Sequence, residues 1–229
     1  MPVTESKVDT RPIRSFHSRR GRVRPTAAAA LERLWPVWGV PYSPELDVNE
    51  LFADYPQILI EIGCGLGEAT LDFARKNPEI GVLAIDVHRP GLGVLLRECE
   101  KHDVTNMRVM DCDAVAVLQN CVAPDSVDEF RIFFPDPWPK ARHNKRRLIQ
   151  PPFVSLLTSR LRIGGRLHLA TDWQDYADQM LEVMSAEPLL RNDFDGFAPR
   201  PDTRLVTRFE RKGLDKGHQI NDLILTRIN

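Results

Sequence analysis

Short apolar runs alternate with amphipathic segments along the middle of the chain. The first run, ILIEIG at residues 58–63, is rich in β-branched residues and ends in glycine, which is typical of a buried strand that leads into a turn. The pattern then predicts helices at 67–76, 90–101, 113–119, 150–162 and 173–186, and strands at 81–86, 107–110, 127–134 and 165–171. This alternation predicts a doubly wound α/β fold, in which a mostly parallel sheet carries helices on both faces.

The N-terminal end departs from this alternation. Residues 1–25 lack apolar periodicity and carry many charges, so we expect a basic, flexible arm there. A short helix is predicted to follow, with Thr26 as its cap and residues 27–35 as its body, stopped by Pro36 and Pro41.

The C-terminal end also has its own pattern. The runs RLVTRFERKG (204–213) and INDLILTRIN (220–229) are both strand-like, and the segment that joins them contains glycine. They predict an antiparallel pair that closes the sheet at one edge.

The size and charge of the chain limit what it can be. A length of 229 residues suits one α/β domain and is short for two, so we expect a single domain at 26–229. The formal net charge of −1 excludes a general binder of polyanions, and any contact with nucleic acid must be local. Basic residues gather in the first 24 residues and again at 140–147, where five cations occur without an acid.

The four cysteines form no CxxC pair and show no zinc-site spacing with histidine, which favours a reduced, cytoplasmic setting. The apolar stretch AAAALERLWPVWGV is interrupted by Glu32 and Arg33, so neither a signal peptide nor a membrane span is predicted.

Three glycines, Gly63, Gly65 and Gly67, follow the first predicted strand in the sequence EIGCGLGEAT. Glycine between a strand and a helix allows a tight turn and a close approach of the backbone to a ligand. A dinucleotide fingerprint needs its third glycine at position 68, which is Glu68 here, so NAD binding is disfavoured.

Acidic residues stand at the predicted strands beside this turn. Asp86 ends the second strand 19 residues after Gly67, where a carboxylate can bind ribose hydroxyls. Asp113 follows the third strand and can accept a hydrogen bond from an exocyclic amine, while Glu61 lies inside an apolar strand and needs a cationic or hydroxyl partner. Acids at strand ends often only cap helices, but these converge on the edge where open α/β sheets bind ligands. Together with the glycine turn they resemble the S-adenosylmethionine site of class I methyltransferases.

The stretch FFPDPWPKARHNKRR, residues 133–147, joins the end of the fourth strand to the second basic cluster. Asp136 lies between Pro135 and Pro137, and each proline fixes its own φ, so this loop is predicted to be a rigid platform. In a doubly wound sheet the fourth strand ends beside the first, and we expect Asp136 to face the reactive end of the cofactor. The alternative interpretation is that Asp136 is a turn aspartate that only caps the next segment.

These motifs, with RSFHSRRGR, LERLWPVWG, LATDWQDYADQM and TRFERKG, resemble the tRNA (guanine-N7-)-methyltransferase family in its single-subunit bacterial form. The resemblance extends from about residue 12 to the end, and PDPWPKxRHxKRR is far more specific than the glycine turn. It implies a Rossmann-like class I methyltransferase with a mostly parallel seven-stranded sheet and an antiparallel C-terminal strand. The implied reaction moves a methyl group from S-adenosylmethionine to N7 of a guanosine in tRNA, at position 46 of the variable loop. The implied enzyme is cytoplasmic, with tRNA as its partner, no membrane and no obligatory protein partner.

Carried over by position, the resemblance also assigns roles to residues. Asp136 is the expected catalytic residue. The expected cofactor contacts are Asp136 with Glu61, Gly63, Gly65, Gly67, Asp86 and Asp113. The expected substrate contacts are Lys140, Asp172, Thr207, Arg208, Phe209 and Glu210, and the expected RNA contacts are Arg142, His143, Asn144, Lys145, Arg146 and Arg147. The six histidines show no ligand spacing, so no metal is expected.

Several of these residues have a second interpretation. Asp172 can cap the helix that follows it. The TRFE motif at 207–210 is also compatible with ordinary strand alternation. For the chain as a whole, a methyltransferase acting on a small molecule leaves both basic clusters without a role. A non-catalytic RNA-binding subunit predicts damaged site acids, whereas Glu61, Asp113 and Asp136 are all present.

Overall fold

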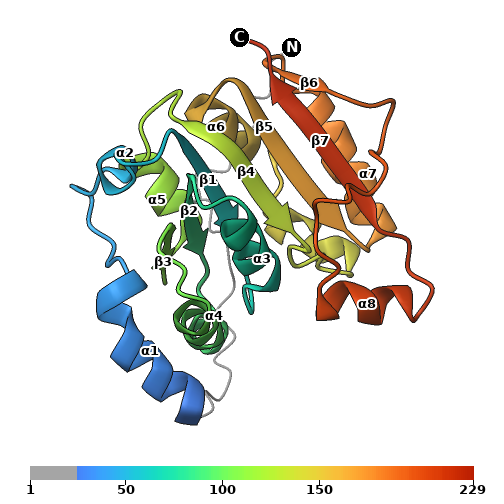
Figure 1. Cartoon of the computed structure of the whole chain (residues 1–229). Helices are drawn as coiled ribbons and strands as arrows, with labels where there is room; N and C mark the ends of the chain where they lie inside the picture. Colours follow the sequence, from blue (N-terminus) through green and yellow to red (C-terminus); the bar gives the residue numbers. More distant parts are fainter. Residues whose placement is uncertain (1–24) are drawn as a thin grey trace, which may run out of the picture.

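The computed structural model describes residues 25–229, so the predicted arm lies outside the described residues except for Pro25. Within residues 25–229 the chain forms a seven-stranded sheet in the order β3-β2-β1-β4-β5-β7-β6 (Figure 1). The strands are β1 (Gln57–Ile62), β2 (Ile80–Ile85), β3 (Met107–Met110), β4 (Val127–Phe133), β5 (Leu161–Thr171), β6 (Leu190–Asn192) and β7 (Asn221–Arg227). The helices are α1 (Pro25–Trp38), α2 (Val48–Leu51), α3 (Glu68–Lys76), α4 (Arg89–Lys101), α5 (Ala114–Asn120), η1 (Ala141–Arg146), α6 (Pro151–Arg160), α7 (Gln174–Ser185) and α8 (Arg208–Leu214).

Strands β1 to β5 pair in parallel, and β7 pairs antiparallel with both β5 and β6. The strand order reverses between β1 and β4, because β1 continues outward to β2 and β3 while β4 continues to β5. The predicted fold class is confirmed. Ligands in open sheets of this type bind at such a switch point, beyond the carboxyl ends of the strands.

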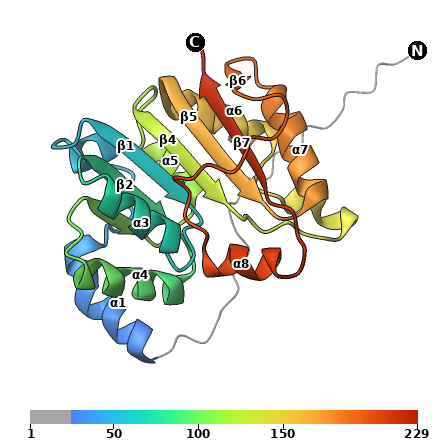
Figure 2. The same ribbon diagram turned by 45° about the vertical axis from the view of Figure 1, so that its right-hand side comes forward.

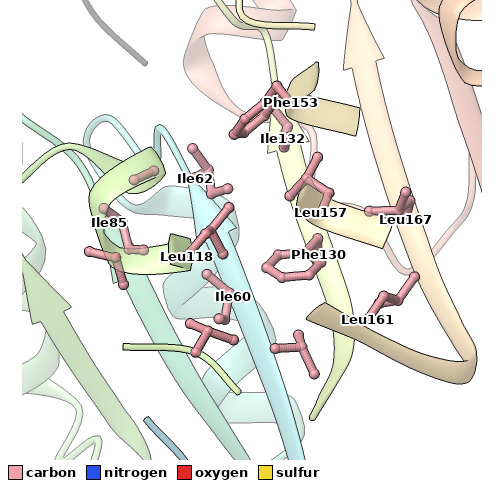
Figure 3. Close-up of a cluster of buried hydrophobic side chains, with 14 of the residues drawn as sticks. Ile60, Ile62, Ile85, Leu118, Phe130, Ile132, Phe153, Leu157, Leu161 and Leu167 are labelled. Carbon is pink, nitrogen blue, oxygen red and sulfur yellow. The ribbon is translucent and has the colours of Figure 1, made fainter. Parts of the chain in front are cut away.

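Helices cover the two faces of the sheet (Figures 1 and 2). On one face, α1, α3 and α4 pack over β1, β2 and β3 around a buried cluster that includes Leu34, Leu59 and Leu95. On the other face, α5, α6 and α7 bury a larger cluster that includes Ile60, Phe130 and Leu157 (Figure 3). Leu59 and Ile60 are neighbours in β1 and point to opposite faces, as the period of a strand requires.

The predicted ends of α1 are wrong. The helix begins at Pro25, so Thr26 is not its cap, and it continues through Pro36 to Trp38. Proline removes one backbone donor, but only Val37 and Trp38 follow Pro36 in the helix. The buried Trp38 fixes this end by donating from Nε1 to the Val104 carbonyl at 2.7 Å.

The C-terminal prediction was half correct. INDLILTRIN contains β7, but RLVTRFERKG forms a loop followed by α8. The antiparallel neighbours of β7 are β5 and the three-residue β6. Thr207 begins α8 as an N-cap whose side chain accepts a hydrogen bond from the Glu210 amide, so T-x-x-E is the start of a helix. Strand β5 also begins earlier than predicted, at Leu161, in residues assigned to the preceding helix.

Figure 2 shows α8 at the end of the sheet where β1 and β4 finish. The fold therefore brings the C-terminal segment to the same edge as the glycine turn. Among the described residues, every helix is too short or too polar to cross a membrane.

Candidate active site

The glycine turn after β1 uses left-handed backbone at all three predicted positions. The φ angles of Gly63, Gly65 and Gly67 are 80°, 60° and 74°, values that disfavour any side chain. Among residues 25–229, no atom lies within 4 Å of a Cβ added at Gly63 or Gly65, so the described part of the chain leaves space beside this backbone. The turn therefore leaves room for a ligand against its main chain.

Asp86 fixes the shape of this turn. Its Oδ2 accepts a hydrogen bond from the Gly65 amide, and its Oδ1 accepts one from the His88 amide, both at 2.7 Å. Each carboxylate oxygen retains acceptor capacity after one such bond. The same side chain can therefore hold the turn and accept further hydrogen bonds from a ligand.

A cavity of about 190 Å³ opens at the carboxyl ends of β1, β2 and β4. Gly63 and Asp86 line it from the first two of these strands, and Asp136, Trp138 and Arg146 line it from the segment after β4. The structure thus brings the glycine turn, the acid of the second strand, the predicted catalytic acid and one cation of the basic run together.

A second cavity of about 290 Å³ adjoins the first. Gly63, Phe133 and Phe134 line both cavities, while Glu61 and Phe209 belong to the second alone. Phe209 reaches this cavity from α8, is 57% exposed, and lies with its ring centroid 5.2 Å from that of Phe134. The two cavities together span the site from β2 to α8.

Glu61 is buried in the second cavity with an incomplete set of partners. Only 3% of the residue is exposed, and within residues 25–229 its Oε2 atom has no hydrogen-bond partner. Burial raises the pKa of Glu61 to about 7, although the nearby Arg131 guanidinium acts to lower it. An acid in this state favours a ligand that brings a positive charge or a donor.

The loop that carries Asp136 has unusual backbone on both sides. Phe134 and Trp138 have φ angles of 53° and 47°, which are uncommon for residues other than glycine. Prolines 135 and 137 lie between them, and the exposed Asp136 side chain stands at the wall of the first cavity. Asp136 therefore lies in the wall of the cavity beyond the carboxyl ends of the strands.

The basic run forms the 3₁₀ helix η1 and divides into outward and inward residues. Lys140, Arg142, Lys145 and Arg146 are exposed, and the Arg146 guanidinium lies 5.1 Å from the centroid of the Trp138 ring. His143 and Asn144 are half-buried. Of these four exposed cations, Arg146 lines the first cavity, and Lys140, Arg142 and Lys145 are exposed in or directly before the same short helix.

Arg147 differs from these residues because its side chain is only 1% exposed. In this structure the side chain is directed into the protein and does not join the exposed run. The predicted RNA contact is thus not accessible at Arg147.

Glu210 is the second predicted contact that points inward. It is fully buried, and its carboxylate accepts hydrogen bonds from Arg204 at 2.7 and 3.0 Å and from Arg200 at 3.0 Å. Arg204 also donates to both oxygens of Asp222 on β7, at 2.8 and 2.9 Å. Glu210 therefore ties α8 to the sheet, while Thr207, on the same motif, lines the second cavity.

Arg208 lines the second cavity and is also held to the glycine turn. Its backbone N–H donates to Glu68 at 2.7 Å, and its guanidinium pairs with the same carboxylate. Helix α8 is thereby anchored on one side to β7 and on the other to the start of α3.

Two other predicted acids have clear structural partners. Asp113 caps α5, where it accepts a hydrogen bond from the Val115 amide at 3.0 Å, and its neighbour Cys112 lines the first cavity. Asp172 was considered as the cap of α7, but Trp173 occupies that position and Asp172 contacts His218 Nδ1 at 2.9 Å. The capping interpretation of Asp172 is therefore wrong.

Sequence reasoning missed a row of buried polar residues on the α3 face of the sheet. Glu61, Arg131 and His168 are paired in register across β1, β4 and β5. His168 Nε2 lies 2.8 Å from Asp222, but burial outweighs that carboxylate and lowers the pKa of His168. The signal for this row was a charged or polar residue inside the apolar run of each of three strands. Of these residues, only Glu61 was singled out from the sequence.

Comparison with known proteins agrees with this geometry. A family model described as a putative methyltransferase matches residues 56–223. The tRNA (guanine-N(7)-)-methyltransferase of Streptomyces avermitilis is 51% identical over 221 residues, covering 95% of this chain and 76% of that protein. The protein of the same name from Nitrosospira multiformis is 50% identical over 218 residues, covering 95% of this chain and 95% of that protein. Among solved structures, the 16S rRNA methyltransferase KamB superposes with a TM-score of 0.61 at 16% identity, over 81% of this chain and 95% of that one.

Proposed function

The chain belongs to the tRNA (guanine-N(7)-)-methyltransferase family, and we propose that it transfers a methyl group from S-adenosylmethionine to N7 of a guanosine in tRNA. The observation that carries this proposal is the position of Asp136 in the wall of the cavity that Gly63 and Asp86 also line. By the resemblance described above, the target is the guanosine at position 46.

The residues of the two cavities fit S-adenosylmethionine. Glu61 Oε2, which has no hydrogen-bond partner within residues 25–229, suits the ammonium group of the cofactor, and the carboxylate of Asp86 suits its ribose hydroxyls. The open backbone at Gly63 and Gly65 allows close approach. When bound, S-adenosylmethionine supplies a methyl group that is activated by its positively charged sulfur.

The chain's main task toward guanine is alignment. Guanine N7 carries no proton and presents a lone pair in the plane of the ring, so no base has to remove a proton before attack. Holding nucleophile and methyl group in line can contribute about 7–11 kcal/mol in the best intramolecular cases. We assign this positioning to the loop of Asp136 and to α8, which face each other across the paired rings of Phe134 and Phe209.

Asp136 is suited to act on guanine directly. Its carboxylate can accept hydrogen bonds from N1 and the exocyclic amine, which distinguishes guanine from adenine. The carboxylate also stabilises the positive charge that appears on the purine ring during transfer. Both roles need an ionised side chain held at the cavity wall, where the prolines on either side place it.

The remaining predicted contacts divide by exposure. We assign the tRNA backbone to the exposed cations Arg142, Lys145 and Arg146, because phosphate contacts dominate nucleic-acid affinity. His143 and Asn144 lie in the same helix. Around the reacting nucleotide, the proposed contacts are Lys140, Asp172, Thr207, Arg208 and Phe209, and Glu210 acts only by holding α8 in place.

The direct test supplies S-adenosylmethionine with a labelled methyl group and an unmodified tRNA transcript, then digests the RNA and identifies the labelled nucleoside. We expect 7-methylguanosine, and we expect none when guanosine 46 of the transcript is replaced by adenosine. Label in another nucleoside would disprove the proposed reaction. Label that persists in 7-methylguanosine after the replacement would disprove the assigned position.

The same assay separates the two rival functions. A methyltransferase for a small molecule would not require RNA for transfer from the cofactor. A non-catalytic RNA-binding subunit would bind tRNA but fail to bind S-adenosylmethionine in a titration. We expect cofactor binding without RNA and methyl transfer only with it.

A further inference from the structure

Arg147 lies at the end of the basic run, but its contacts connect two elements of the protein. Its Nε donates to the Pro137 carbonyl at 2.8 Å, and its Nη1 donates to Gln179 Oε1 on α7 at 2.7 Å. Its Nη2 pairs with the Asp175 carboxylate, and its guanidinium lies 4.8 Å from the centroid of the Tyr176 ring. All three nitrogens of the guanidinium thus have protein partners.

The Pro137 carbonyl belongs to the residue directly after Asp136. In this loop Pro135, Pro137 and Pro139 have no backbone N–H, so these three positions cannot donate main-chain hydrogen bonds that would hold the loop. A side-chain donor aimed at a loop carbonyl is the available alternative. Arg147 supplies this donor beside the predicted catalytic acid.

Helix α7 provides the fixed support. Gln179 Nε2 donates to the Ile149 carbonyl at 3.1 Å, and the Tyr176 hydroxyl accepts a hydrogen bond from the Ile149 amide at 3.1 Å. Gln179 therefore contacts both Arg147 and the backbone two residues later. The chain after η1 is held to α7 at two points, and the loop of Asp136 is tied to the same helix through Arg147.

We propose that Arg147 is a positioning residue, which holds the Pro137 carbonyl and thereby sets the place of Asp136, and that it does not grip RNA. This inference rests on the proposed function, because it concerns the placement of the acid that acts on guanine. A phosphate contact would require the side chain to leave Pro137, Gln179 and Asp175, and it is 1% exposed in the structure. A lysine cannot replace it, since one ammonium cannot reproduce the planar, divergent donors of guanidinium.

The two roles of Arg147 predict different measurements. A residue that binds phosphate lowers the slope of log Kd for tRNA against log salt by about 0.7–0.9 when its charge is removed. A positioning residue leaves that slope unchanged and lowers kcat, because small displacements of catalytic groups cost up to about a hundredfold. The experiment therefore measures tRNA binding at several salt concentrations and kcat at saturating tRNA and S-adenosylmethionine.

For Arg147→Gln and Arg147→Lys we expect kcat to fall tenfold to a hundredfold, on the order of the effect of a displaced group. The salt slope stays at the wild-type value in both. Lys145→Gln, two residues earlier in the basic run, is the matched comparison, and its slope should fall by about 0.7–0.9. A reduced slope in Arg147→Gln together with near-normal kcat in Arg147→Lys would overturn the proposal.

Loss of S-adenosylmethionine binding and of the thermal transition would show that Arg147→Gln fails to fold. In that case Gln179→Ala tests the same connection between the Asp136 loop and α7. Gln179 lines neither cavity, so a lowered kcat at unchanged salt slope supports the proposal, and a wild-type kcat overturns it. If the wild-type enzyme methylates no tRNA, the proposed function fails. The salt slopes still decide between the two roles of Arg147, because binding needs no turnover.

Discussion

Replacing Glu61 by glutamine removes the ionisable group from the second cavity while keeping its size. The pKa of Glu61 is raised from its ordinary value of 4.5 to about 7, with burial as the main cause. Each tenfold change in proton affinity corresponds to about 1.4 kcal/mol, so the ionised form costs the folded protein about 3 kcal/mol. Within residues 25–229 the Oε2 atom has no hydrogen-bond partner, so a cationic ligand that pairs with it offsets this cost, and cofactor binding should depend on the charge of Glu61.

The expected pH dependence follows from the same value. With a pKa of about 7, the ionised fraction of Glu61 rises from about 1/11 at pH 6 to about 10/11 at pH 8. Ionisation of Glu61 should therefore strengthen S-adenosylmethionine binding about tenfold over this range, measured as the rise in the ratio of the Glu61→Gln to the wild-type dissociation constant. In Glu61→Gln this contribution is absent, and a lost charge-assisted hydrogen bond of about 2 kcal/mol weakens binding about thirtyfold at pH 8.

The folding stability of the ligand-free protein should fall as pH rises, whereas cofactor affinity should increase. Between pH 4.5 and about 7 the folded protein binds more protons than the unfolded chain at Glu61, so stability is lost as pH rises through this window. Above about pH 7 the full cost is present. Without ligand, Glu61→Gln should then be more stable than the wild type at pH 8 and gain little at pH 4.5, as measured by urea unfolding.

Calorimetric titration with S-adenosylmethionine at pH 6, 7 and 8 is the assay. The amine of the ligand titrates identically with both proteins, so the ratio of the two dissociation constants isolates Glu61. Glu79→Gln makes the same chemical change at an exposed position before β2, at the opposite end of the sheet, and should match the wild type. Equal pH dependence in wild type and Glu61→Gln would refute the reasoning.

Three further variants test other parts of the site. Asp136→Asn keeps the shape of the side chain, so we expect wild-type cofactor affinity with kcat reduced about a hundredfold; a normal kcat would exclude a central role. Glu210→Gln leaves the buried Arg204 guanidinium without its full counter-charge and should cost about 3 kcal/mol in urea unfolding, whereas a change under about 0.5 kcal/mol, typical of surface substitutions, would mean that the pair does not fix α8. Thr207→Ala removes the N-cap of α8 and should cost about 1 kcal/mol; an unchanged melting temperature would count against the cap.

The parallel part of the sheet was predictable because buried strands produce short, continuous apolar runs. Strand β3 was placed at its observed residues, and β1, β2 and β4 within about one residue, a margin at which assignments of element ends commonly differ. The segment 204–213 was not predictable in the same way, since its residues fit both strand alternation and a capping box. The helix is favoured because it buries Glu210 against Arg204, which in turn binds Asp222 on β7. No local sequence pattern connects these residues with β7.

The convergence of three predicted acids on one edge of the sheet was predictable for a topological reason. Glu61, Asp86 and Asp136 belong to three strands whose carboxyl ends meet at the switch point once the sheet is doubly wound. The direction of single side chains could not be predicted. Arg146 and Arg147 are adjacent cations in the sequence, but Arg146 lines the first cavity and Arg147 is buried against α7. The direction of each side chain depends on how η1 packs, which the sequence pattern does not give.

Each of the two motifs assigned to ligand contact contains one charged residue that is turned into the protein. Arg147 ties the segment after β4 to α7, and Glu210 ties α8 through Arg204 to β7. Buried charges with several hydrogen bonds have few alternative positions, since an unpaired buried charge is costly. The walls of the two cavities are therefore fixed relative to the sheet before tRNA arrives. Under the proposed function, the ordering cost of tRNA binding falls mainly on the exposed cations of η1, whose side chains lose entropy when they contact phosphate, and not on the groups proposed to align guanine.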